Sequence, residues 1–326
     1  MTANKAFKQR VRERARRTGE SYTAALRHFR QPSEGTTVPN SNPFRISVAQ
    51  LDAPTDPRDA DAFQRVGHDV RRLMTEAHDQ GARLIHFCEG TLCSPNKRIL
   101  SSDPTTMADA DWSRFDWAAQ RDQLEAIRKH AAALRLWTVV GAVHQLTEPH
   151  RPRNSLYVID DQGRIVTRYD ERMLSNTKVS YLYTPGTSPI TFDIDEVRFG
   201  CALGMESQYP ELFAEYERAD VHCVLLSTMD NGTVFGLQTQ AHASTNSYWI
   251  SYATVAADAA AAPSGIAAPD GRWATRCGPD AISALVTVDI GREHEGLARP
   301  WRRTARGGRY ASAVVDDDPR AQRSSL

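Results

Sequence analysis

The sequence predicts a layered α/β protein with a mixed β-sheet, and three features of the chain point to this class. Short apolar runs, several alternating with polar residues as in half-buried strands, recur from Phe44 onward. Amphipathic stretches, with apolar residues three and four positions apart, separate some of these runs. Asp161–Gly163 is a turn signal directly between two of them and indicates a hairpin. Together these features favour helices packed on a sheet that has parallel and antiparallel neighbours.

The elements can be assigned in chain order from these patterns. Val66, Val70 and Leu73 fall on one face of a first helix, predicted over 62–80. Further helices are predicted over 119–135 and 211–218, and His242 is expected to begin another. The predicted strands cover 44–50, 83–87, 137–143, 154–159, 164–169, 198–203, 222–227, 248–255 and 284–290.

Composition and charge exclude several classes of protein. The 326 residues include 40 Lys and Arg and 40 Asp and Glu, which argues against a chain that binds polyanions throughout. No apolar run approaches the roughly 20 residues of a membrane span, and the basic N-terminus lacks the apolar core of a secretory signal. The five cysteines show neither a CxxC pair nor a zinc-binding spacing. The sequence therefore predicts a cytoplasmic protein with no membrane partner and no metal.

The chain divides into three segments by composition. Residues 1–40 are predicted to form a basic helical arm and linker, because residues 1–30 carry nine Lys or Arg and only two Glu. Residues 41–300 form the main domain, and residues 301–326 a polar tail. Residues 16–29 resemble the helical part of ribbon-helix-helix antitoxins, although the DNA-reading strand is missing. A regulator that binds DNA or protein through this arm is therefore an alternative, and nucleic acid is not the favoured partner.

Six short motifs, several of them at the ends of predicted strands, follow one another along the chain. They are Leu84–Gly90, Asn154–Tyr157, Tyr169–Leu174, Tyr183–Gly186, Gly200–Phe213 and Pro269–Trp273. In this order and spacing they resemble the nitrilase superfamily, also called the carbon–nitrogen hydrolases, over about residues 44–301. The resemblance implies an α-β-β-α sandwich that hydrolyses a non-peptide C–N bond of a small molecule. It also implies that the reaction uses no metal or organic cofactor.

The resemblance assigns three catalytic positions. In that family a cysteine attacks the substrate carbon, a glutamate acts as general base and a lysine stabilises the developing charge. The glutamate position is Glu89, which is present, whereas the lysine position is Glu171 and the cysteine position is Gly204. Loss of the nucleophile alone removes on the order of 10⁶ of rate in comparable hydrolases. The substitutions therefore predict a pseudoenzyme, or a binding or regulatory subunit, with little or no hydrolase activity.

Nearby residues offer partial replacements for the missing groups. Cys93 follows the base position on a loop and is a candidate relocated nucleophile, although a non-catalytic thiol is the favoured interpretation. Cys88 and Cys201 are predicted to be core thiols that point away from the site. Lys178 is favoured as a solvated loop lysine, and the alternative is a lysine that turns into the pocket.

The remaining candidates are expected to shape the pocket. Glu206 is predicted to support the site from behind, and His144 and Tyr209 to line the pocket. Glu89 and Glu171 are expected to share a proton or to recruit a cation, because two close carboxylates do not both ionise easily.

Ligand and partner follow from the resemblance. A small amide, nitrile or amine is the expected ligand. A homo-oligomer such as a homodimer, or a hetero-oligomer with an active homologue, is the expected assembly. The alternative to a pseudoenzyme is an active amidohydrolase that uses a relocated thiol, or water activated by one of the carboxylates.

Overall fold

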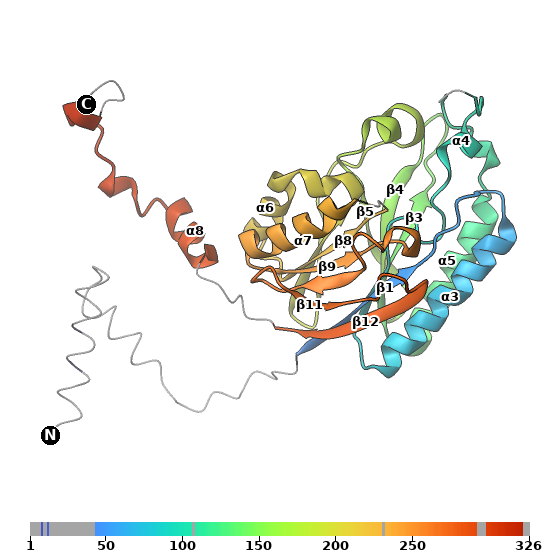
Figure 1. The fold of residues 1–326 in the computed structure, drawn as a ribbon, viewed down its shortest axis with the longest axis horizontal. Helices are drawn as coiled ribbons and strands as arrows, with labels where there is room; N and C mark the ends of the chain where they lie inside the picture. Colours follow the sequence, from blue (N-terminus) through green and yellow to red (C-terminus); the bar gives the residue numbers. More distant parts are fainter. Residues whose placement is uncertain are drawn as a thin grey trace. The chain divides into compact units, whose positions relative to one another are not determined.

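Two six-stranded sheets lie face to face, and helices cover their outer faces (Figure 1). The computed structural model describes residues 8, 12, 43–105, 108–229, 232–291 and 298–321. The first sheet has the order β12 (Ser283–Ile290), β1 (Phe44–Leu51), β2 (Leu84–His86), β3 (Trp137–His144), β4 (Arg153–Ile159) and β5 (Ile165–Asp170). The second has the order β11 (Trp273–Arg276), β10 (Gly265–Ala267), β9 (Trp249–Ala253), β8 (Cys223–Ser227), β7 (Val197–Leu203) and β6 (Thr191–Ile194).

Both sheets are mixed, with parallel strands at their centres. β1, β2 and β3 run parallel, and β4 and β5 follow as antiparallel neighbours, so β5 points in the same direction as β2. β7, β8 and β9 are also parallel. The loops after β2 and β5 therefore leave the first sheet at the same edge, where side chains from both can meet.

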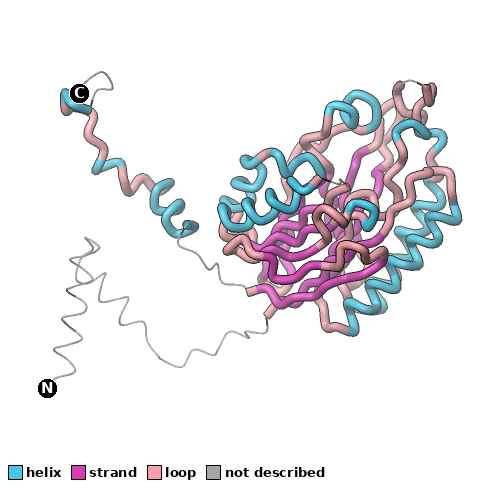
Figure 2. Tube along the Cα trace, in the orientation of Figure 1, coloured by secondary structure: helices cyan, strands magenta, loops and turns pink. Residues whose placement is uncertain are grey.

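Helices cover the outer face of each sheet (Figure 2). α3 (Ala60–Asp79) and α5 (Trp117–Leu134) lie on the first sheet, and α6 (Pro210–Arg218) and α7 (Thr233–Asn246) on the second. Asp59 and Asp116 cap the two longer helices by accepting from the backbone N–H of Ala62 and Ala119. The other helical segments are α4 (Lys97–Leu100), α8 (Ala298–Arg306), a π-helical turn η2 (Lys178–Leu182), and the 3₁₀ turns η1 (Trp112–Arg114), η3 (Gly204–Gln208), η4 (Ala256–Asp258), η5 (Ala311–Ala313) and η6 (Pro319–Ala321). The expected α-β-β-α layering is confirmed.

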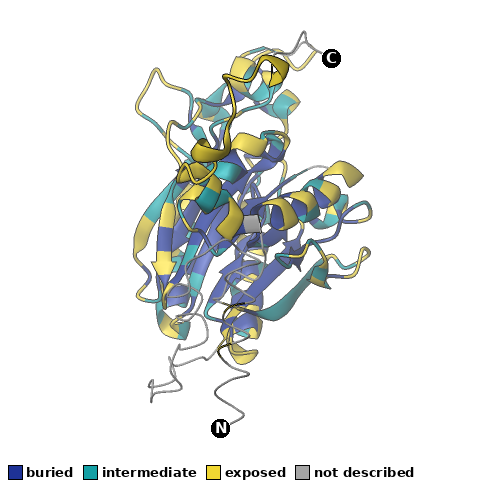
Figure 3. Cartoon of the chain, turned by 90° about the vertical axis from the view of Figure 1, so that its left-hand side faces the viewer, coloured by how far each residue is buried: buried dark blue, intermediate teal, exposed yellow. Residues whose placement is uncertain are grey.

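The core lies between the two sheets and beneath the helices (Figure 3). Phe44 of the first sheet packs on Phe199 of the second, with ring centroids 5.3 Å apart. His86 also lies between the sheets, 2.7 Å from Ser227 Oγ and 3.0 Å from Ser251 Oγ. Burial lowers the pKa of His86 to about 3, so this histidine is a neutral core residue.

Most predicted elements are present within one or two residues of their expected bounds, but one helix start is wrong. His242 lies near the end of α7, which begins at Thr233. The sequence does not indicate this start, because the apolar residues of Thr233–Ala241 have no clear helical spacing. β6, β10 and β11 have three or four residues each, too few for a periodicity to emerge.

The two ends of the chain are described to different extents. The predicted N-terminal arm lies outside the described residues, apart from Lys8 and Arg12. α8 spans the expected start of the polar tail, and its Arg306 pairs with buried Glu217 at 2.6 Å. None of the helices that the structure describes has the length and apolar character needed to cross a bilayer.

Candidate active site

Glu89, Glu171 and Gly204 meet where three strands end. Glu89 follows β2, Glu171 follows β5, and Gly204 follows β7 and begins η3. β2 and β5 leave the first sheet at one edge, and Gly204, after β7 of the facing sheet, lies beside the carboxylates of Glu89 and Glu171. The three positions that the sequence resemblance assigns therefore come together.

Lys178 lies between the two carboxylates. Its Nζ donates to Glu89 Oε1 at 2.5 Å and to Glu171 at 3.0 Å (Oε1) and 2.8 Å (Oε2). The Lys178 side chain is only 14% exposed, and that of Glu171 is 0% exposed. The prediction of a solvated loop lysine is therefore wrong. A buried pair of carboxylates requires a cation, and η2 turns Lys178 inward to supply it. We call Glu89, Glu171 and Lys178 the charged triad.

Asn154 on β4 completes the hydrogen bonding of the charged triad. Its Nδ2 donates to Glu89 Oε1 at 2.9 Å and to Glu171 Oε2 at 2.6 Å. Both carboxylates thus share the same two donor groups, Lys178 and Asn154, which holds them in fixed positions. The sequence places Asn154 in a family-like motif but gives no sign that it joins two carboxylates.

The protonation of the triad follows from its burial. Burial raises the pKa of Glu171 to about 8, although the Lys178 charge opposes this shift. Burial acts to lower the pKa of Lys178, but the charges of Glu171 and Glu89 outweigh it and raise that pKa overall. Lys178 therefore stays protonated at neutral pH, and Glu171 is the carboxylate that takes up a proton first.

A second lysine, missed by the sequence analysis, lies within electrostatic reach of the triad. Lys97 begins α4 and is half-buried. Its pKa is lowered, first by burial and then by the charge of Lys178, while Glu89 and Glu171 act in the opposite direction. The four groups are two acids and two amines, so opposite charges lie near one another in this buried region.

Gly204 leaves no room for a side chain. Its φ is +47°, in the left-handed region that favours glycine. A Cβ built on it would lie 2.8 Å from Glu89 Oε2, 3.4 Å from Lys178 Nζ and 3.5 Å from Glu171 Oε1. The charged triad thus surrounds the place that a side chain at residue 204 would occupy.

Glu206 holds the surrounding backbone. Its carboxylate accepts from the Tyr169 hydroxyl at 2.8 and 2.7 Å, and from the backbone N–H groups of Arg172 (2.7 Å), Met173 (3.2 Å) and Leu203 (2.8 Å). These bonds tie the loop after β5 to the end of β7. Glu206 therefore positions the segments that carry Glu171 and Gly204.

Glu206→Gln is expected to destabilise the fold by about 2–3 kcal/mol, because a buried amide cannot accept from all of these donors. Urea denaturation measures the loss, with exposed Glu211→Gln on α6 as the matched control. Equal stability of the two variants would contradict this role.

The cysteines lie away from the charged triad. Cys88 Sγ faces Thr91 Oγ1 at 3.5 Å, and Cys93 belongs to a hydrophobic cluster with Phe115 and Leu182. Cys201 is a core thiol in the cluster between the sheets. All five cysteines of the chain are buried, and burial raises the pKa of each. None is therefore prepared to act as a thiolate.

His144 and Tyr209 serve other contacts. His144 Nδ1 lies 2.7 Å from the Tyr157 hydroxyl, at the end of β3. Tyr209 precedes α6 and packs on the cluster between that helix and the second sheet. His242 stacks on Phe213 and lies 2.8 Å from the Ser207 carbonyl oxygen. In the described part of the chain, no group of three or more His, Cys, Asp or Glu is arranged to hold a metal ion.

Solved amidase structures share this fold. A cysteine-to-alanine variant of the amidase of Nesterenkonia AN1, from the nitrilase superfamily, superposes with a TM-score of 0.63 at 17% identity, covering 84% of this chain and 100% of its own. A glutamate-to-glutamine variant of the Nesterenkonia sp. AN1 amidase, with the acetamide moiety of fluoroacetamide on its active-site cysteine, gives 0.61 at 16% identity, covering 82% and 99%.

The match to a protein-family model shows to which family the chain belongs. Comparison with curated proteins gave no match. The model described as "Carbon-nitrogen hydrolase" matches residues 45–300, well over half of the chain. This match agrees with the two-sheet layering and with the meeting of Glu89, Glu171 and Gly204 at the strand ends. The chain therefore belongs to the carbon–nitrogen hydrolase family.

Proposed function

We propose that this chain keeps the carbon–nitrogen hydrolase fold without cysteine-dependent hydrolysis, and acts as a binding or regulatory protein for a small amide, nitrile or amine. The observation that carries the proposal is the charged triad closed around Gly204. A glycine cannot form a thioester or thioimidate with a substrate. Oε1 of Glu89 accepts from Lys178 and Asn154, and Oε2 faces the place that a Cβ of residue 204 would occupy.

A relocated nucleophile receives little support. Cys93 is the cysteine nearest in sequence after Glu89, yet it is buried among apolar side chains and burial raises its pKa. Activation of water by a carboxylate is also disfavoured, because Lys178 and Asn154 donate to Glu171 and to Oε1 of Glu89. A carboxylate that already accepts these hydrogen bonds is a weaker base toward a water molecule.

The test is ammonia release from a panel of amides, nitriles and carbamoyl compounds, with an active amidase of the family as the positive control. We expect no release by the wild-type chain above the rate without protein. We also expect no acetamide adduct after incubation with fluoroacetamide, measured by intact mass. Release that is lost in Glu89→Gln, or an adduct on any cysteine, would overturn the proposal.

A further inference from the structure

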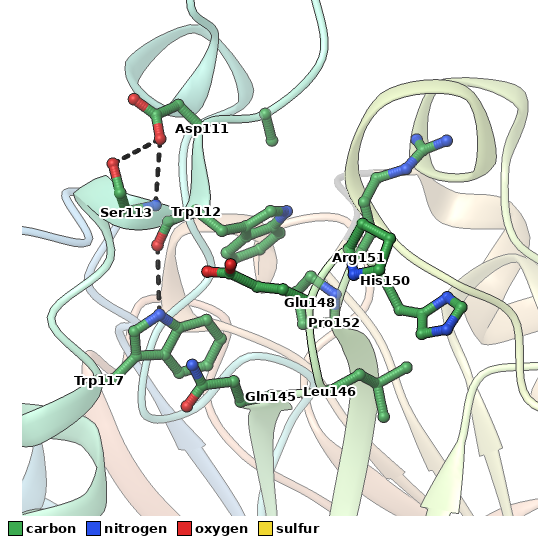
Figure 4. A pocket seen from close by; sticks show the side chains of 12 residues that line it. Asp111, Trp112, Ser113, Trp117, Gln145, Leu146, Glu148, His150, Arg151 and Pro152 are labelled. Atoms are coloured by element: carbon green, nitrogen blue, oxygen red, sulfur yellow. Dashed lines mark hydrogen bonds between the residues drawn. The ribbon is translucent and has the colours of Figure 1, made fainter.

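A concave site whose lining includes no residue of the charged triad lies beside η2. It is a cavity of about 390 Å³ between the segment before α5 and the connection from β3 to β4 (Figure 4). It is lined by Ala110, Asp111, Trp112, Ser113, Trp117, Gln145, Leu146, Glu148, Pro149, His150, Arg151 and Pro152. This volume is in the range of small-molecule sites, about 300–1,000 Å³. None of the lining residues belongs to the triad, so its ligand need not be the triad's ligand.

Two tryptophans form a fixed aromatic wall. The rings of Trp112 and Trp117 lie 5.9 Å apart between centroids, with an interplanar angle of 35°. Trp112 Nε1 donates to the Leu182 carbonyl oxygen at 3.1 Å, and Trp117 Nε1 donates to the Trp112 carbonyl oxygen at 3.2 Å. The polar edges of both rings are therefore occupied. Both rings also pack on Phe115, so the ring surface that remains on the cavity side is what they offer to a ligand. Among aromatic side chains, indole is the strongest partner for an organic cation.

Glu148 supplies a carboxylate beside this wall. Figure 4 shows it reaching toward Trp112 and Trp117. Across the described residues, no hydrogen bond or ion pair reaches the Glu148 side chain. The nearby cation, Arg151, points away from Glu148 in Figure 4 and donates to the Val179 carbonyl oxygen at 3.2 Å.

The other carboxylate of the cavity is already engaged. Asp111 accepts from Ser113 N at 3.1 Å and Ser113 Oγ at 2.6 Å, and it pairs with Arg114 at 3.3 Å. Glu148 is thus the acid that remains available for a ligand. A single free carboxylate next to two indole faces matches a cation that is organic and weakly hydrated, rather than a metal ion that needs several oxygen ligands.

We propose that this cavity binds a small alkylammonium ion, with its charge between Glu148 and the faces of Trp112 and Trp117. The carboxylate provides the ion pair, and the indoles provide both apolar contact and cation–π attraction. The proposal is independent of the function proposed for the charged triad, because it uses none of the same residues.

The test compares choline with its neutral isostere 3,3-dimethylbutan-1-ol, by calorimetry and by tryptophan fluorescence on the full chain. We expect choline to bind at least about tenfold more tightly, because the shapes match and only the charge differs. Glu148→Gln should weaken choline about tenfold, and Trp117→Leu should abolish the fluorescence change. Glu211→Gln, on α6 outside the cavity, is the matched control and should bind as the wild type does.

Three outcomes would overturn the proposal. They are no binding of choline or of butyltrimethylammonium at millimolar concentration, equal affinity for the neutral isostere, and unchanged affinity in Glu148→Gln. Circular dichroism of each variant establishes that it is folded. Since Glu148 is exposed, its replacement by Gln is not expected to disturb the fold.

Discussion

Replacing Glu171→Lys, Lys178→Glu and Gly204→Cys together is expected to give this chain measurable amide hydrolysis. The three changes return a lysine to the end of β5 and a thiol to the start of η3, and they keep the number of charges around Glu89. Glu89 Oε2, 2.8 Å from the Cβ position of residue 204, must still shift to admit the new side chain, and removal of the Lys178 ammonium releases the Glu89 carboxylate for this movement. We expect ammonia release at least about 10² above the wild-type background, because a nucleophile and an oxyanion partner are both restored.

The same changes with Gly204→Ala in place of Gly204→Cys form the control, since they restore the charges without a nucleophile. The double variant Glu171→Lys with Gly204→Cys should be at least about tenfold slower than the triple variant. It leaves two lysines against one carboxylate, which costs stability and holds Glu89 in an ion pair. If Gly204→Cys alone were as active as the triple variant, Lys178 would already serve the reaction where it stands.

Lys178→Met is expected to destabilise the fold by about 3–5 kcal/mol at about pH 9, where Glu171 is ionised, because it leaves two buried carboxylates without their cation. Glu171 is fully buried and Glu89 nearly so. The loss should be smallest in acid. Folding raises the pKa of Glu171 from 4.5 to about 8, so its contribution to stability is complete below about 4.5 and disappears as the pH rises through 8. Without the Lys178 charge, which acts to lower that pKa, the decline should be steeper.

Urea denaturation at about pH 5 and about pH 9 measures the difference. The double variant Lys178→Met with Glu171→Gln is the control, because it removes one charge of each sign. It should recover at least half of the stability that the single variant loses at about pH 9. A single variant with the same stability deficit at both pH values would contradict the buried ion cluster.

The fold could be predicted from the sequence because the patterns that indicate each helix and strand lie within short stretches of the chain. Alternation and helical spacing predict the long helices and nearly all of the longer strands, and the motif order predicts how they are layered. The charged triad could be predicted from the sequence only in part. Glu89 and Glu171 follow strand ends that motif order identifies. The position of Lys178 depends on the path of η2, a π-helical turn whose sequence, KVSYL, carries no periodic signal. The available clue was electrostatic, since a buried acid at Glu171 demands a cation nearby.

The residues expected to line the pocket show a second limit of prediction from the sequence. His144 and Tyr209 were expected to line the pocket. Their side chains make other contacts, since proximity in the chain does not fix the direction of a side chain. Asn154 shows the opposite case. Its motif was visible, but its role depends on two carboxylates that arrive from other strands.

The left-handed backbone at Gly204 also bears on the history of the chain. Two of the four glycine codons become cysteine codons by one base change, so a thiol at this position is within genetic reach. That change would place a side chain against the Glu89 carboxylate at a positive φ, while Glu171 at the end of β5 is still an acid. We expect it to cost stability and to supply no hydrolysis, so that selection would have nothing to favour until the charges had also been exchanged. On this expectation, no change of a single residue leads this chain to catalysis.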